Sequence, residues 1–317
     1  MSGTQFASQG DLTDKVVTFS EVGPNLYAYT AEGDPNTGII IGDDSCMVID
    51  AQATPLMAKD VIARVRTITD KPIKYVVLSH YHAVRVLGAS AYNASEVVAH
   101  ETTRKLIIER GEEDKASEIA RFPRLFRGQD SIPGLTWPTL TFEGSLTLWL
   151  GKRRVDIFHP GRGHTAGDTV AWVPDAEVLF SGDLIEYKSA CYCGDAFLRE
   201  WPGTLKRLAS YKPVAVVPGR GDALVGREKV DAAIAGTTGF VTELYEAAER
   251  AVTKGYSLKE AHAEVRKALD GPFGDYAIYE HCLPFNVSRA YDEARGIDWP
   301  RIWTDARDLE MWKSLQA

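Results

Sequence analysis

The order of the apolar segments is the feature that most constrains the fold of this chain. Four short apolar or alternating runs are separated by Gly/Pro/Asn/Asp turn formers, and a segment with helical spacing and a fully apolar run follow. These segments are 16–19, 26–30, 37–41, 46–49, 54–69 and 73–78. A similar order returns at 140–142, 146–150, 155–158, 169–172, 178–181, 201–211 and 214–217. Two β-sheets packed back to back with helices outside would accommodate both halves, so we predict an α/β fold.

Two segments lie outside these halves. Residues 101–135 are highly charged and indicate helices at 102–109 and 113–120, which we interpret as an insertion or cap over the core. From about residue 226 the chain is helical, with amphipathic stretches at 230–253 and 257–269, a helix at 284–295 and a capping box at Ser257-x-x-Glu260. We therefore expect one domain over 1–225 and a helical C-terminal extension over 226–317 packed on it.

Composition excludes several classes of protein. The 317 residues carry a formal net charge of -8, which disfavours nucleic-acid binding because phosphate contacts need clustered Lys and Arg. There is no run of about eighteen apolar residues and no N-terminal signal pattern, so we expect no membrane partner. Four cysteines do not make a disulfide framework, which favours reduced thiols and a cytoplasmic protein. The helical end, with its tryptophans, could pair two chains as a homodimer.

A pair of histidines follows the apolar run at 73–78. His80 and His82 are one residue apart, so both imidazoles can point the same way from an extended segment. Loops at the carboxyl ends of strands commonly carry the reacting groups of α/β proteins. The pair therefore indicates a metal site, and a solvated loop is the alternative.

Two further segments supply candidate metal ligands. His164 lies in a glycine-rich loop, Pro160-Gly-Arg-Gly-His-Thr-Ala-Gly-Asp168, where glycines let the backbone turn tightly. Asp183 directly follows an apolar strand and Gly182. An aspartate in that place can ligate a metal, although capping a turn or a helix is its commoner use.

Together these segments resemble the metallo-β-lactamase superfamily over residues 15–222. The family signature is H-x-H-x-D-H after a strand, then G-H-T-x-G, then an apolar strand ending in G-D, and later G-H-G. The resemblance implies an αββα sandwich and makes 1–225 a catalytic domain. It places the first metal on His80, His82 and His164 and assigns the bridging aspartate to Asp183.

The chain departs from this signature at three positions. Val84 and Arg85 stand where the family has Asp and His, and Arg220 replaces the late histidine. In the family these three residues bind a second metal. Val has no donor atom and Arg stays protonated, so we expect a mononuclear site. The two guanidinium groups could replace the second cation and bind an anionic substrate, or they could only form salt bridges with Asp183 or Asp50.

Three imidazoles and a carboxylate suit one divalent ion, with Zn²⁺ expected first and Fe²⁺ or Mn²⁺ also compatible. A metal-bound water would then act as the nucleophile, with Asp183 orienting it or taking its proton. Arg85 or Arg220 would hold the developing oxyanion. The loop after Asp183 is expected to line the pocket, with Tyr192 and Cys193 touching the substrate.

These features favour a metal-dependent hydrolase acting on a small anionic ester, lactone or amide. A β-lactam substrate is less favoured, since one metal and two arginines depart from the usual arrangement. A mononuclear non-haem iron oxygenase of the same fold is the second interpretation. A non-catalytic binding protein is the third, although four retained ligands argue against it.

Overall fold

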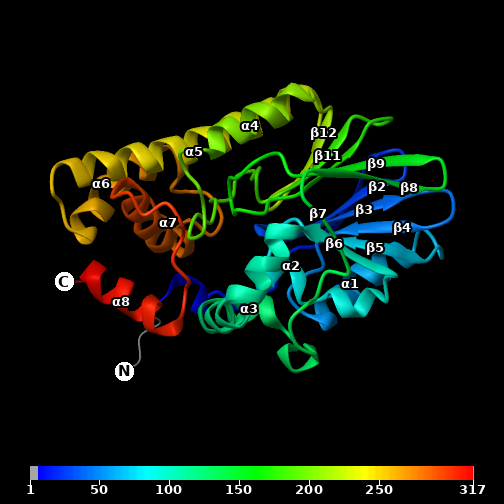
Figure 1. Ribbon diagram of the computed structural model, residues 1–317, viewed down its shortest axis with the longest axis horizontal. Coiled ribbons are helices and arrows are strands. Elements are labelled where there is room, and N and C mark those ends of the chain that lie inside the picture. The colour runs from blue at the N-terminus through cyan, green and yellow to red at the C-terminus, as the bar shows by residue number, and fades with distance from the viewer. Residues whose placement is uncertain (1–5, 317) are drawn as a thin grey trace.

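The computed structural model describes residues 6–316 and contains a pair of β-sheets, which lie on the right in Figure 1. The first sheet keeps its strands in chain order. They are β1 (Thr18–Gly23), β2 (Leu26–Ala31), β3 (Asp34–Ile41), β4 (Cys46–Ile49), β5 (Ile73–Val77), β6 (Glu96–His100) and β7 (Leu140–Phe142). Pairing is antiparallel from β1 to β4 and parallel from β4 to β7, so the carboxyl ends of β4 and β5 meet at one edge.

The second sheet has the strand order β13-β12-β11-β10-β9-β8. Its strands are β8 (Ser145–Leu150), β9 (Arg153–Phe158), β10 (Val170–Val173), β11 (Val178–Gly182), β12 (Ala215–Pro218) and β13 (Leu224–Val225). Only β11 and β12 pair in parallel among these strands, so the ends of both point to the same edge.

The two sheets pack face to face around a shared apolar core. Met47 and Ile49 of the first sheet and Ile157 and Phe180 of the second belong to one buried cluster. Gly38 is needed there because a Cβ atom at that position would overlap the Phe180 ring. The packing confirms the predicted αββα sandwich.

Helices on the outer face of the first sheet are α1 (Pro55–Arg66), α2 (Ala83–Val86) and α3 (Glu101–Arg121). Thr54 begins α1, since its hydroxyl accepts the Met57 N–H at 3.1 Å. The two helices expected between 102 and 120 are one continuous helix, and that expectation was wrong. Gly111 costs only about 1 kcal/mol inside a helix, and it gives Leu135 room to approach.

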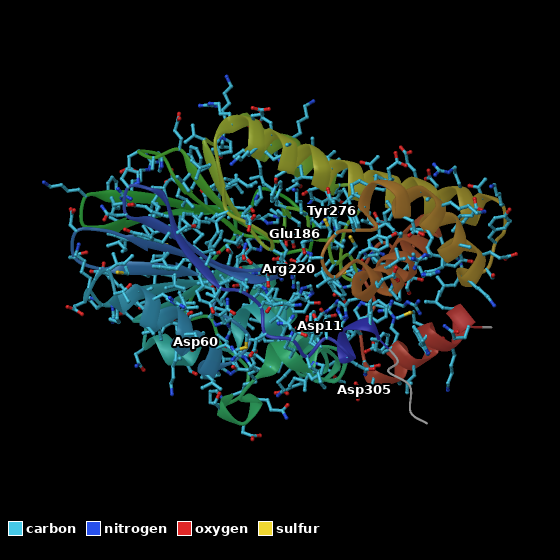
Figure 2. All side chains as sticks on the ribbon, turned by 180° about the vertical axis from the view of Figure 1, so that it is seen from behind. Asp11, Asp60, Glu186, Arg220, Tyr276 and Asp305 are labelled. Carbon is cyan, nitrogen blue, oxygen red and sulfur yellow. The ribbon has the colours of Figure 1, made fainter. Side chains whose placement is uncertain are left out.

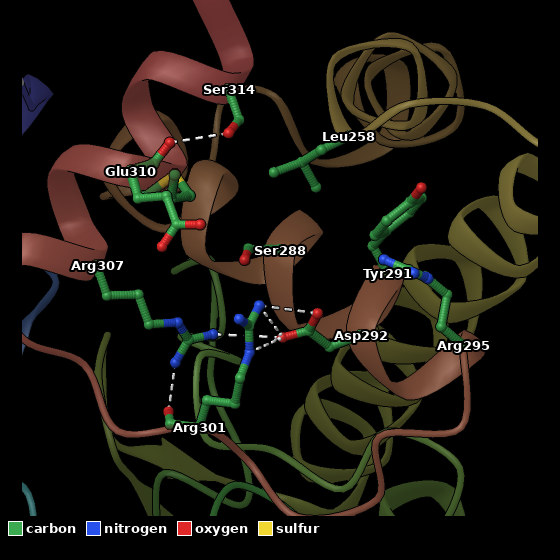
Figure 3. A pocket seen from close by; sticks show the side chains of 10 residues that line it. Leu258, Ser288, Tyr291, Asp292, Arg295, Arg301, Arg307, Glu310 and Ser314 are labelled. Atoms are coloured by element: carbon green, nitrogen blue, oxygen red, sulfur yellow. Dashed lines mark hydrogen bonds and ion pairs between the residues drawn. The ribbon is translucent and has the colours of Figure 1, made fainter.

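The second sheet packs against α4 (Trp201–Ser210) and the start of the first C-terminal helix, and the other C-terminal helices lie beyond it (Figure 1). The C-terminal helices are α5 (Arg227–Thr253), α6 (Leu258–Phe273), α7 (Tyr279–Ala294) and α8 (Asp305–Gln316). The expected capping box of α6 is present, because Ser257 and Glu260 exchange side-chain and backbone hydrogen bonds. The bounds of α8 were not predicted, although it lies within the extension expected to be helical. Arg307 of α8 and Arg301 just before it both pair with Asp292 of α7 (Figure 3).

The C-terminal helices share a core with the second sheet. Trp172, Leu179 and Val216 of the sheet belong to the same buried cluster as Phe240 of α5 and Phe285 of α7. The first described helical turn, η1 (Ala7–Gln9), contacts α3 and α7. Within residues 6–316 no helix combines the length and the apolar character needed to cross a membrane.

Candidate metal centre

The histidine pair lies in the loop after β5, where hydrogen bonds of Ser79 hold the backbone. Ser79 donates its N–H and its hydroxyl to the two Asp50 oxygens, each at 2.8 Å, and its carbonyl accepts the Thr169 N–H at 2.7 Å. Asp50 adopts a left-handed backbone conformation (φ 63°), which Asp tolerates better than most residues. His80 and His82 are consequently held in place and almost fully buried.

His164 is placed by a loop that Asp168 closes. The Asp168 carboxylate accepts the Thr165 N–H at 2.9 and 3.0 Å and the Thr165 hydroxyl at 2.7 Å. Gly163 lets the loop approach Leu184 and Trp201, since a Cβ atom there would lie 2.5 Å from Leu184 Cδ2. The loop directs the imidazole of His164 toward His80 and His82.

The three imidazoles converge on one point. His164 Nε2 lies 3.2 Å from His80 Nε2 and 3.0 Å from His82 Nδ1. Ligand nitrogens about 2.0–2.1 Å from a tetrahedral Zn²⁺ lie about 3.3 Å apart, which is close to these distances. Among the described residues, these three form a group whose ligand atoms all lie within 4.8 Å of one another. The donor set therefore fits one divalent ion.

The far side of two of these rings is hydrogen-bonded. His80 Nδ1 lies 2.9 Å from the Ser79 hydroxyl, and His82 Nε2 lies 3.1 Å from Asp195 Oδ2. Such partners fix the orientation and the tautomer of a metal-binding imidazole. Arg110 lies 3.4 Å from the other oxygen of Asp195, which holds that carboxylate in turn.

Asp183 lies beside the three histidines between two arginines. Its Oδ2 atom is 3.6 Å from His164 Nε2 and 3.9 Å from His80 Nε2. Arg85 binds Oδ1, and Arg220 donates to Oδ2 at 2.7 Å. Gly219 leaves room for this carboxylate, because a Cβ atom there would collide with Oδ1. Asp183 falls outside the convergent histidine group, so its role as a ligand stays a prediction.

The two arginines differ in their surroundings. Arg85 has no exposed surface, and its terminal nitrogens donate to Asn36 O at 3.0 Å, to Gly219 O at 2.8 Å and to Asp183. Arg220 pairs with Asp183 and, at 3.3 Å, with Glu186 (Figure 2). The salt bridges expected as an alternative are therefore present. Arg85 has fewer N–H groups free to bind a substrate than Arg220 has.

Burial and these ion pairs shift the pKa values of the site in opposite directions. Burial lowers the pKa of His80 and His164, that of His164 to about 3. Burial also disfavours charge on His82, but the hydrogen bond with Asp195 and nearby carboxylates outweigh it and raise its pKa to about 9. Burial would raise the pKa of Asp183, yet Arg85 and Arg220 hold it well below the usual range.

A narrow cavity adjoins the histidines. Its free volume is about 20 Å³, which holds about one water molecule. Of the four residues expected to contact the substrate, Tyr192 and Arg220 line this cavity, and Cys193 and Arg85 are not among its lining residues. The lining consists of His82, Val84, Glu118, Arg121, Phe122, Leu125, Asp183, Tyr192, Arg220, Ile278, His281 and Cys282.

Sequence reasoning missed the contribution of α3 to this site. Asp114 accepts the Ala83 N–H at 2.7 Å and Glu118 accepts the Val84 N–H at 3.0 Å, so both carboxylates cap α2 directly after His82. Arg121 lines the cavity on the same helix. The four-residue spacing of Asp114 and Glu118, which puts them on one helix face, was the available signal.

Residues 30–220 match the family model of the metallo-beta-lactamase superfamily, which is more than half of the chain. The chain therefore belongs to this superfamily. The metallo-beta-lactamase type 2 of Bacillus sp. (strain 170) is 26% identical over 219 residues, covering 65% of this chain and 76% of that protein.

A second kind of relative is longer than this chain. The linear primary-alkylsulfatase of Pseudomonas sp. (strain ATCC 19151) is 23% identical over 262 residues, covering 72% of this chain and 49% of that protein. The chain thus matches about half the length of this relative.

Solved structures show the same fold. A metallo-beta-lactamase from Pontibacter korlensis has a TM-score of 0.57 at 21% identity and covers 72% of this chain and 99% of its own. The sec-alkylsulfatase Pisa1 from Pseudomonas sp. has a TM-score of 0.70 at 19% identity and covers 88% of this chain and 50% of its own. Because 88% of this chain is more than residues 1–225 contain, the match to this structure includes part of the C-terminal helices.

Proposed function

We propose that the protein is a metal-dependent hydrolase that uses one divalent ion to cleave a small anionic ester, lactone or amide. The observation that carries the proposal is the convergence of His80, His82 and His164 beside an Asp183 already neutralised by two arginines. Family membership and relatives named as a β-lactamase and an alkylsulfatase support hydrolysis as the reaction class.

The three histidines, with Asp183 as a fourth candidate ligand, would hold the ion, and Zn²⁺ fits the donor set best. When bound, the ion would lower the pKa of a coordinated water and supply the nucleophile near neutral pH. Two guanidinium groups keep Asp183 ionised, so its carboxylate suits accepting a hydrogen bond from that water and orienting it.

The arginines support a site with one ion. Val84 offers no ligand atom, and the guanidinium groups of Arg85 and Arg220 both contact Asp183. Two fixed positive charges there would repel a second divalent ion and compensate for its loss. Arg220, which lines the cavity, is the better candidate for contact with the substrate or its oxyanion, and Arg85 is better suited to holding Asp183.

Metal analysis combined with a substrate panel tests the proposal. Protein purified without chelator should contain one divalent ion per chain and hydrolyse a member of a panel of carboxylate-bearing esters, lactones and sulfate esters. His82→Ala should lose both the metal and the activity. His262→Gln, which changes a histidine of α6 that has no contact with the site, should keep both.

Two other results would overturn the proposal. Stoichiometric iron with substrate-dependent oxygen uptake would indicate an oxygenase. Absence of stoichiometric metal, with a ligand still bound, would indicate a binding protein.

A further inference from the structure

A second guanidinium group, that of Arg121, lines the cavity together with Arg220. Arg121 is the last residue of α3 and is 2% exposed, whereas Arg220 follows β12 of the other sheet and is 5% exposed. Both side chains line the same cavity as His82 and Asp183. Two cations carried by different elements therefore line one cavity next to His82.

Arg121 has few partners for a buried cation. Its guanidinium lies over the rings of Phe285 and Tyr192, with 4.3 and 5.0 Å to their centroids, and Nη1 donates to the Tyr192 hydroxyl at 3.2 Å. Its ion pair is with Glu118, whose Oε1 atom is 3.9 Å from Nη2 while Oε2 accepts the Val84 N–H. Burial disfavours the charged form, but the Tyr192 hydroxyl, Asp308, Glu118 and Asp114 outweigh it and raise the pKa of Arg121. Among the described residues no group accepts the Arg121 Nε–H.

Buried arginines of the chain differ in how well they are satisfied, and the Nε–H groups of Arg85, Arg110 and Arg307 also lack an acceptor among the described residues. Arg124 is held by both oxygens of Asp34, at 2.5 and 2.6 Å, and also reaches Asp11. Arg220 has an ion pair with Asp183, but its Nε–H also lacks an acceptor among the described residues. A buried N–H without an acceptor is unfavourable, and the oxygens of a ligand in this cavity could supply acceptors to Arg121 and Arg220.

From this arrangement we infer that Arg121 and Arg220 form a binding subsite for the oxyanion group, carboxylate or sulfate, of the substrate. The inference deepens the proposed function and depends on it for the identity of the site. Arginine suits this task because its planar fork donates two parallel hydrogen bonds to such a group. Arg121 thereby acts as a positioning residue, since it fixes where the substrate lies relative to the histidines.

A larger pocket adjoins the cavity and could hold the rest of the ligand. Phe122, Ile278 and His281 line both this cavity and an outer pocket of about 250 Å³. The cavity itself has room for about one water molecule, so a single oxygen of the oxyanion would enter it. The body of the ligand is expected in the outer pocket, beside Tyr276 and Tyr279. Ile278 holds a left-handed backbone conformation (φ 57°), which is unusual for a β-branched residue, at the boundary of the two spaces.

Anion binding to the protein before and after metal removal tests this inference. Benzoate and sulfate are titrated separately into each form by calorimetry, so that binding to the ion itself is distinguished from binding to the arginines. Wild-type protein should bind at least one of the two anions in both forms. Arg121→Lys should weaken this binding about tenfold, because an ammonium group cannot donate the two parallel hydrogen bonds of a guanidinium group.

Arg124→Lys is the matched control, since Arg124 is a buried arginine of the next turn with partners outside the cavity. It should leave anion binding and activity unchanged. Arg121→Gln should weaken binding further than Arg121→Lys, and far-UV circular dichroism checks that both variants fold. If Arg121→Gln does not fold, the comparison of the two lysine variants decides.

Equal affinity in wild-type protein and Arg121→Lys, equal weakening in Arg124→Lys, or no anion binding by the wild type would each overturn the inference. Failure of the proposed function gives a different result. In that case the protein lacks metal or hydrolytic activity, while anion binding still depends on Arg121.

Discussion

Asp195 lies beyond the histidine cluster, yet it sets the orientation of His82. Its Oδ2 atom is 3.1 Å from His82 Nε2, which leaves Nδ1 directed toward His164. The contact joins residues 113 positions apart in the chain. A carboxylate in this position raises the basicity of a metal-binding imidazole and holds its ring in place.

Asp195→Asn is therefore expected to weaken metal binding without removing a ligand. The amide keeps the shape of the side chain and loses the charge, and such changes typically cost about 10–100-fold in metal affinity. Competition with a chromophoric chelator measures the dissociation constant. Asp156→Asn, on β9 and away from the site, is the control, and an unchanged affinity in Asp195→Asn would contradict the role given to this carboxylate.

Sequence alone predicted the histidines better than their surroundings. His80, His82 and His164 each lie in a short motif whose local spacing carries the information, and the structure brings all three together. Asp195 and Arg121 carry no such motif, because their roles depend on loop and helix packing across long separations in the chain. Cys193 was expected at the cavity, but it lies buried beside Asn286, whose side chain accepts the Cys193 N–H.

At the scale of elements, α3 supports the short helix that follows the histidine pair. The first N–H groups of α2 have no partner within the helix, and carboxylates near a helix N-terminus satisfy them and favour its dipole. Asp114 and Glu118 supply these acceptors from α3. The segment interpreted as a cap is thus also a structural support for the metal loop.

Asp114→Ala should destabilise the protein by about 1–3 kcal/mol, because it leaves the buried Ala83 N–H without an acceptor. Urea denaturation followed by circular dichroism measures the free energy of unfolding. Asp114→Asn keeps an oxygen that can accept this bond and should lose much less stability. Equal losses in the two variants would show that the hydrogen bond is not the cause.

The elements themselves were largely predictable where apolar periodicity was strong. The strand at Cys46–Ile49 and the helix after Ser257 agree with expectation, since a continuous apolar run and a capping box are local signals. The break expected within α3 was wrong, because tertiary packing around Gly111 outweighed its weak helix propensity. The sequence analysis identified no apolar pattern for α8. Asp292 of α7 pairs with Arg307 of this helix and with Arg301 just before it.

At the scale of the whole molecule, the helical extension completes the core of the second sheet. Trp172, Leu179 and Val216 share one buried cluster with residues of α5 and α7. Removing the extension would expose that face of the sheet to water, at about 25 cal/mol for each Å² of apolar surface. The boundary expected at residue 226 therefore separates parts of the sequence that share a core.

A fragment of residues 1–225 is accordingly expected to aggregate or to remain partly unfolded, whereas the full chain should unfold in one cooperative transition. Size-exclusion chromatography of the fragment and calorimetry of the full chain measure these outcomes. A fragment ending at residue 253, which keeps α5, should be more soluble. A soluble 1–225 fragment with a sharp melting transition would show that the extension is an independent domain.

Arg85 and Arg220 also affect how much of the protein would be loaded with metal when metal is scarce. Their charges are part of the chain, so no chelator or competing metalloprotein can remove them. On the proposed one-metal centre, a fixed cellular supply of the ion would load twice as many copies as it would of a two-metal enzyme. Asp183 would stay neutralised before the ion arrives, which keeps the empty centre in the arrangement that the ion requires.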